Sequence, residues 1–111
     1  MHINLLTKQN KLYAKIIGEL DHHCSAEIKE QIDNRIISEG ISTLVFDLSA
    51  LSFMDSSGIG VIIGRYKLMK SLGGQVYIVS SNKTVDKLLL LSGIPDIIKV
   101  TDNADEIDKL A

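Results

Sequence analysis

Hydrophobic residues follow two alternating spacings along the chain, one typical of strands and one typical of helices. Short apolar runs bounded by polar or glycine positions predict strands, and stretches in which apolar residues return every three or four positions predict helices. Strands are predicted at residues 3–7, 11–17, 43–49, 75–79 and 97–100. Helices are predicted at residues 25–38, 56–72 and 83–92, and after Asp102.

Capping residues and glycines mark where these predicted helices begin and end. The first helix is stopped by Gly40 and the second by the glycine pair at 73–74, because glycine readily adopts the backbone conformation that follows a helix C-terminus. Asn82 is the expected N-cap of the third helix, which ends before Gly93. Asp102 is the expected cap of the last helix. Its apolar face is predicted to carry Ala104, Ile107 and Leu110.

The order of these elements, β β α β α β α β α, predicts an α/β fold in one domain spanning residues 1–111. Successive strand–helix units imply parallel strands joined by right-handed crossovers, and the short connection between the first two strands implies an antiparallel hairpin at one edge. We therefore expect a mixed, mainly parallel sheet of about five strands with four helices. Periodicity alone leaves open whether the helices cover one face of the sheet or both.

Composition and charge narrow the class of protein. The 111-residue chain is 45% apolar and 23% charged, with a formal net charge of −2, values that are ordinary for soluble globular proteins. Because it has no basic block, direct nucleic-acid binding is not expected. Its apolar runs fall short of the ~20 residues of a spanning helix, and its N-terminus lacks a signal-peptide pattern. The lone Cys24 fits a reducing compartment, so we expect a cytoplasmic protein without membrane insertion.

The stretch "LSFMDSSGIGVIIGRYK" at residues 51–67 places two serines at the start of the second predicted helix. A catalytic role for Ser56 would need a nearby base, for which His22 is available, with Asp21 to orient it. The nucleophile-elbow pattern G-x-S-x-G is absent, because its first glycine is missing whichever serine is chosen. A serine hydrolase using Ser56 and His22 is therefore an alternative with little support.

Gly58, Gly60 and Gly64 suggest a nucleotide-binding loop, but their spacing disfavours it. They form G-x-G-x-x-x-G, one residue longer than the dinucleotide fingerprint, and no P-loop lysine follows them. Inside a helix each glycine costs roughly 1 kcal/mol relative to alanine. We therefore interpret them as positions where the helix packs closely on the sheet.

A helix cap and a modification site are the two remaining roles for this corner, and they are compatible. Asp55 or Ser56 can accept hydrogen bonds from the free N–H groups of the first helical turn. The small residues that follow leave the corner bare and its hydroxyl accessible to a macromolecule. A phosphate would add about −1.5 to −2 charges, which a helix N-terminus tolerates. The added repulsion beside Asp55 would nevertheless disfavour a docked partner.

A second constellation, "GELDHH" at residues 18–23, closes the second predicted strand. Parallel strands end at one edge of a sheet, so Asp21 and His22 are expected to flank Ser56 on one surface. The alternative is an ordinary turn and solvated loop, and a metal site would need further ligands of defined geometry. We expect neither a metal nor a cofactor.

Together, the two motifs closely resemble those of the anti-sigma factor antagonists of the STAS domain family, and most of all its sporulation branch. The runs "GGQVYIV" and "LLLSGI" also fall where this family has a strand and the end of its third helix. The resemblance covers essentially the whole chain, although the C-terminal third diverges and Ile59 stands where leucine is common. It implies helices on one side of the sheet and a non-enzymatic protein that is monomeric on its own.

The resemblance further implies a partner switch controlled by phosphorylation. In this family the unphosphorylated antagonist binds an anti-sigma factor that is also an ATP-using serine kinase, and so releases a sigma factor, here one for sporulation. The kinase modifies the first serine of D-S-S-G, which is Ser56 here; binding is then lost, and a serine phosphatase restores it. A STAS module in another sensory pathway remains an alternative. The expected partner-binding residues are Asp21, His22, Asp55, Ser56, Ser57, Gly58, Ile59 and Gly60.

Overall fold

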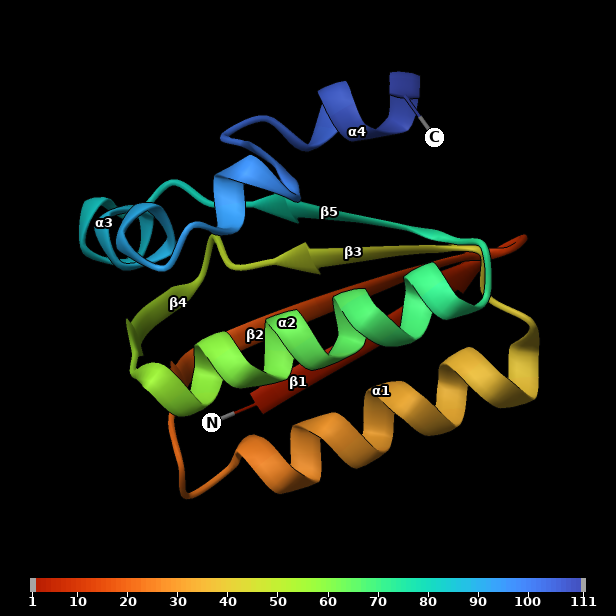
Figure 1. The fold of residues 1–111 in the computed structure, drawn as a ribbon, viewed down its shortest axis with the longest axis horizontal. Coiled ribbons are helices and arrows are strands. Elements are labelled where there is room, and N and C mark those ends of the chain that lie inside the picture. Colours follow the sequence, from red (N-terminus) through yellow and green to blue (C-terminus); the bar gives the residue numbers. More distant parts are fainter. Residues whose placement is uncertain (1, 111) are drawn as a thin grey trace.

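The computed structural model describes residues 2–110, in which six strands and four α-helices build one mixed sheet with helices packed against it (Figure 1). The strands are β1 (His2–Lys8), β2 (Lys11–Leu20), β3 (Thr43–Asp47), β4 (Leu51–Met54), β5 (Gln75–Val79) and β6 (Lys99–Thr101). The helices are α1 (Ser25–Glu39), α2 (Ser56–Ser71), α3 (Lys83–Leu91) and α4 (Ala104–Leu110), with a short 3-10 turn at Ile94–Asp96. The predicted α/β class is confirmed.

The sheet has the strand order β1-β2-β3-β5-β6, with β4 attached beside it to β2. β1 runs antiparallel to β2 at one edge, and every other pair is parallel. The predicted edge hairpin and parallel crossovers are therefore confirmed. Because parallel strands share a direction, the carboxyl ends of β2 and β4 lie together, and α1 and α2 begin beyond them.

The prediction of about five strands missed β4. In β4, Leu51 and Met54 are buried while the two residues between them are exposed, so the segment shows neither strict alternation nor a continuous apolar run. β2 continues to Leu20, past the predicted end at residue 17, and its register shifts between Gly18 and Glu19. Gly18 has φ 93°, a conformation that glycine adopts readily. This irregularity lets β2 pair first with β3 and then with β4.

The main core lies between the sheet and the helices α1 and α2, which run side by side across one of its faces (Figure 1). In α1, the helical spacing of apolar residues predicts a stripe of Ile28, Ile32 and Ile36 with Ile37 beside it; the first three are buried, whereas Ile37 is exposed. Alternate positions of the strands face these helices, as the period of a pleated strand requires. The core residues of β2, β3 and β5 on this face are Leu12, Ala14, Ile16, Leu44, Phe46, Val76 and Ile78.

α4 packs on the opposite face, so the expectation that all helices lie on one side of the sheet is wrong. Ile107 is fully buried against Val45 and Val79, which point away from the main core. The Tyr13 hydroxyl donates to Asp108 Oδ1 at 2.9 Å. Partial burial and the adjacent Asp108 carboxylate raise the pKa of Tyr13 above its ordinary value.

Two details of the last helix also differ from prediction. Asn103, not Asp102, caps it, because Asn103 Oδ1 accepts from the Asp105 backbone N–H at 2.9 Å. The apolar face predicted for α4 is only partly found. Ile107 is buried and Ala104 is exposed, and the Leu110 side chain lies outside the part of the chain that the structure describes. The expected cap of α3 is confirmed: Asn82 Oδ1 accepts from the two backbone N–H groups of its first turn at 2.8 and 3.2 Å.

Candidate functional site

The start of α2 is fixed by Asp55, which has an extended backbone and caps the helix. Its Oδ1 accepts from the backbone N–H of Ser57 at 2.9 Å and of Gly58 at 3.3 Å. Asp55 thus satisfies two donors that a helix N-terminus otherwise leaves free. The sequence allows either Asp55 or Ser56 as the cap, and the geometry assigns it to the Asp55 carboxylate.

The same carboxylate binds the loop that follows β2. Leu20 pairs with Met54 across the β2–β4 ladder, and the Asp55 N–H donates to the Leu20 carbonyl at 3.4 Å. Beyond that pair, the His22 backbone N–H donates to Asp55 Oδ2 at 3.4 Å, and His22 Nδ1 lies 3.7 Å from the same oxygen. The predicted meeting of "GELDHH" with "MDSSG" is therefore present in the structure. It is made by β4, the strand that sequence analysis did not find.

Asp21 organises the loop from within. Its Oδ1 accepts from the His23 backbone N–H at 3.0 Å, and the Cys24 thiol donates to the same oxygen at 3.6 Å. Partial desolvation opposes ionisation of Asp21, but these hydrogen bonds and the neighbouring His23 outweigh it and lower the pKa of Asp21. Burial raises the pKa of the Cys24 thiol, which is typical of a structural cysteine rather than a reactive one.

Ser56 occupies the first position of α2 and is exposed. Within residues 2–110, no hydrogen bond joins its hydroxyl to another side chain, and His22 contacts Asp55 instead. His22 is itself open to solvent, with 67% of its side chain exposed. A serine prepared for nucleophilic attack needs a base aimed at its hydroxyl, so this arrangement does not support the hydrolase alternative. An exposed hydroxyl at a capped helix start is instead open to modification from outside.

The three glycines of α2 have different surroundings. A Cβ on Gly58 would lie 2.5 Å from Met54 Cγ and 2.7 Å from the Leu20 carbonyl oxygen, so Gly58 brings α2 close to β2 and β4, as predicted. A Cβ on Gly60 or Gly64 would meet nothing within 4 Å, so the predicted close packing on the sheet is wrong at these two positions. Gly58 and Ile59, two of the expected partner-binding residues, are buried, so neither is exposed for direct contact with another molecule.

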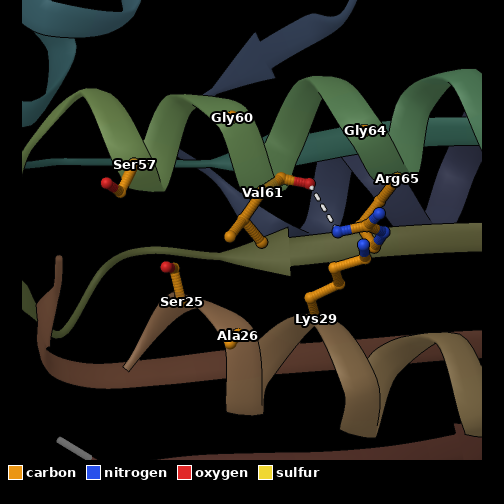
Figure 2. A pocket seen from close by; sticks show the side chains of 8 residues that line it. All are labelled: Ser25, Ala26, Lys29, Ser57, Gly60, Val61, Gly64 and Arg65. Carbon is orange, nitrogen blue, oxygen red and sulfur yellow. Dashed lines mark hydrogen bonds between the residues drawn. The ribbon is translucent and has the colours of Figure 1, made fainter. Parts of the chain in front are cut away.

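A groove separates α1 from α2 along the outside of the helical layer (Figure 2). It has a volume of about 500 Å³ and runs from Ser57 to Arg65 on α2. The small residues that line it are Ser25, Ala26, Ser57, Gly60 and Gly64. Two cations also line it, Lys29 from α1 and Arg65 from α2. We refer to it as the α1–α2 groove.

Arg65 is a buried cation that sequence analysis missed. Only 8% of its side chain is exposed, and its Nε lies 2.7 Å from Asp33 Oδ1 on α1, a close ion pair without the alignment of a hydrogen bond. Its Nη1 donates to the Val61 carbonyl at 3.4 Å. The only signal in the sequence was an arginine within the apolar pattern of α2; its partner, on another helix, could not be found by local spacing.

Within the described residues, no group of three or more His, Cys, Asp or Glu side chains is arranged to hold a metal ion. Over the same residues, none of the helices combines the length and apolar character needed to cross a membrane.

A mixed sheet with a capped, serine-bearing helix start beside the end of β2 defines a protein of the STAS type. The chain belongs to the STAS domain family, which it matches over residues 2–107. It is 39% identical to an anti-sigma F factor antagonist of Paenibacillus polymyxa, over 93% of this chain and 88% of the relative. It is 30% identical to an anti-sigma-B factor antagonist of Bacillus subtilis strain 168, over 91% of this chain and 93% of the relative.

Solved structures agree with this assignment. The anti-sigma factor antagonist SpoIIAA in its unphosphorylated form superposes with a TM-score of 0.79 at 26% identity, over 98% of this chain and 97% of SpoIIAA. The Bacillus cell fate determinant SpoIIAA in its phosphorylated form superposes with a TM-score of 0.78 at the same identity, over 99% of this chain and all of that one. The fold is thus that of SpoIIAA.

Proposed function

We propose that this protein is an anti-sigma factor antagonist whose docking to an anti-sigma factor is switched off by phosphorylation of Ser56. The observation that carries the proposal is the position of Ser56. Its hydroxyl is exposed at the first turn of α2, directly after the capping Asp55 and beside the loop that holds Asp21 and His22. The relatives named as anti-sigma factor antagonists support the same role.

Electrostatics explain how a phosphate at this position switches docking without unfolding the domain. The N-terminal end of α2 favours negative charge through the helix dipole, so the fold accommodates about −1.5 to −2 added charges. Asp55 already accepts hydrogen bonds from the N–H groups of Ser57 and Gly58, so a phosphate on the exposed Ser56 would leave this cap in place. Next to the Asp55 carboxylate, it adds bulk and repulsion to the docking surface.

The partners follow from this switch. We propose that the anti-sigma factor is also the serine kinase, using ATP, and that a serine phosphatase restores the binding-competent form. We favour a sporulation sigma factor as the one released, because the sigma F antagonist is 39% identical to this chain and the sigma-B antagonist 30%. Pull-down against both kinds of anti-sigma factor separates the two pathways, and retention by the sigma-B type alone would move the protein to the other one.

Phosphorylation is tested by incubating the protein with the cognate anti-sigma kinase and ATP, followed by mass spectrometry. We expect one phosphate on Ser56 in the wild type and in Ser57→Ala, and none in Ser56→Ala. Ser56→Ala should still bind the kinase, whereas Ser56→Asp should bind poorly. Modification at Ser57 alone, or at neither serine, would contradict the proposal.

A further inference from the structure

The α1–α2 groove contains two glycines that the folded chain itself does not require. Among residues other than proline, glycine is the least favourable inside a helix, so a helix that contains it usually gains a close contact in return. Gly58 has such a contact, but a Cβ on Gly60 or Gly64 would meet nothing within 4 Å. Both residues face the groove. This chain therefore makes no close contact at these two positions, and they stay open to the close approach of another molecule.

The shape of the groove suits a helix. Gly60 and Gly64 are one turn apart on α2, and on α1 the facing positions Ser25 and Ala26 are also small (Figure 2). Helices pack when side chains of one enter the grooves of another, and the distance between their axes shrinks as the residues in contact become smaller. The groove has a volume of about 500 Å³ between two helices, so side chains of a third helix can pack into it.

The charge of the groove selects an acidic occupant. Lys29 is exposed, and the Arg65 guanidinium forms part of the wall nearby (Figure 2). No carboxylate is among the residues that line the groove, although the whole chain carries a net charge of −2. Asp33 pairs with Arg65. Glu30 and Asp33 line an adjoining hollow that shares Lys29 with the groove, and Lys29 is the exposed cation of the groove itself. Complementary charge of this kind directs docking and fixes its register.

The groove also adjoins the proposed switch. It begins at Ser57, the residue after Ser56, and continues along α2 to Arg65. We propose that an acidic helix of the anti-sigma factor lies in the α1–α2 groove, so that docking extends from Ser56 along the outer side of α1 and α2. This inference rests on the proposed function. It adds a second contact, in the α1–α2 groove, and specifies that the part of the anti-sigma factor that makes this contact is an acidic helix.

The test measures binding of the purified anti-sigma factor from the same organism by calorimetry, with Ser56→Ala present in every variant so that phosphorylation cannot interfere. Gly64→Leu fills the groove, and Lys29→Glu reverses its charge without removing any packing. We expect each to weaken binding about tenfold or more. The matched control is Lys8→Glu, an exposed residue at the β1–β2 hairpin, which should bind within about twofold of the parent. Thermal melting shows that each variant is folded.

The salt dependence of binding provides a second measurement. If Lys29 meets a carboxylate, raising the ionic strength should weaken binding of the parent more steeply than binding of Lys29→Glu. Should the parent protein fail to bind, both the proposed function and this inference are wrong. If the parent binds and both groove variants bind as tightly as Lys8→Glu, the groove proposal alone is wrong. A loss of self-association in the groove variants, with binding unchanged, would assign the groove to a second copy and overturn the proposal.

Discussion

The Asp55 carboxylate contacts His22 with one oxygen and caps α2 with the other. Asp55 Oδ1 caps α2 through Ser57 and Gly58, while Oδ2 receives the His22 backbone N–H at 3.4 Å and lies 3.7 Å from its ring Nδ1. The Asp55 side chain thus connects the loop that follows β2 to the first turn of α2. The shape of the candidate docking surface therefore depends on Asp55 as much as on Ser56.

Two substitutions of Asp55 distinguish its role as the cap of α2 from its contact with His22. Asp55→Ala removes the cap and should lower the free energy of unfolding by about 1 kcal/mol, within the range of about 0.5–2 kcal/mol for lost N-caps. Asp55→Asn keeps an oxygen for the Ser57 and Gly58 N–H groups and should retain most of that stability. Urea denaturation measures both. Asn82→Ala at the start of α3 removes a second N-cap away from the serine, together with the hydrogen bond from Asn82 Nδ2 to the Leu51 carbonyl. Equal losses in Asp55→Ala and Asp55→Asn would show that capping is not what Asp55 contributes.

The glycines of α2 should respond in opposite directions to the same substitution. Gly58→Ala places a Cβ against Met54 and the Leu20 carbonyl and should destabilise the protein by about 1–3 kcal/mol through overpacking. Gly60→Ala and Gly64→Ala place it in open space and should stabilise by up to about 1 kcal/mol, because alanine favours the helix. Chemical denaturation of the three single variants is the measurement. A gain at Gly58, or a loss at both of the others, would mean that the packing described for α2 is incorrect.

Local chemistry made some features predictable from sequence. Asn82 at the start of α3 and Ser56 as the first residue of α2 were identified because capping depends on residues only two or three positions apart. The buried stripe Ile28, Ile32 and Ile36 followed from helical spacing for the same reason. Local chemistry failed where two neighbours are equally suitable: Asp102 and Asn103 are both good caps, and the chain uses Asn103.

Features that depend on distant residues were missed. β4 is a strand because Leu51–Met54 pairs with the end of β2, a partner thirty or so positions away in the sequence. The side on which α4 lies is decided by Ile107 packing on Val45 and Val79. The groove likewise depends on α1 lying beside α2, which also brings Asp33 to Arg65. Periodicity within a segment carries no information about these contacts.

The lowered pKa of Asp21 predicts how stability changes in acid. A group whose pKa is lower in the folded than in the unfolded protein adds stability above its unfolded pKa, and that stability is lost as the pH falls through the folded pKa. For Asp21 the ordinary pKa is 3.8, so its contribution is present near neutral pH and is lost progressively as the pH falls below that value. Between about pH 5.5 and pH 3, the wild type should therefore lose more stability than Asp21→Asn. Urea titrations at the two pH values test this, and parallel losses would contradict it.

The ion pair between Arg65 and Asp33 ties α2 to α1 and should be costly to break from one side. Removing one partner of a buried pair typically costs about 3–5 kcal/mol, because the other charge is left without compensation. Since 27% of the Asp33 side chain is exposed, we expect Asp33→Leu and Arg65→Met to lie near or below the lower end of that range. The double variant should recover much of the loss, because no unpaired charge remains. The control is Arg35→Met, which breaks the half-exposed Arg35–Glu39 pair, expected to contribute no more than about 0.5 kcal/mol, together with the hydrogen bond from Arg35 Nη2 to Thr7 Oγ1. A double-mutant cycle by chemical denaturation gives the coupling, and additive losses would show that the two helices are held together without this pair.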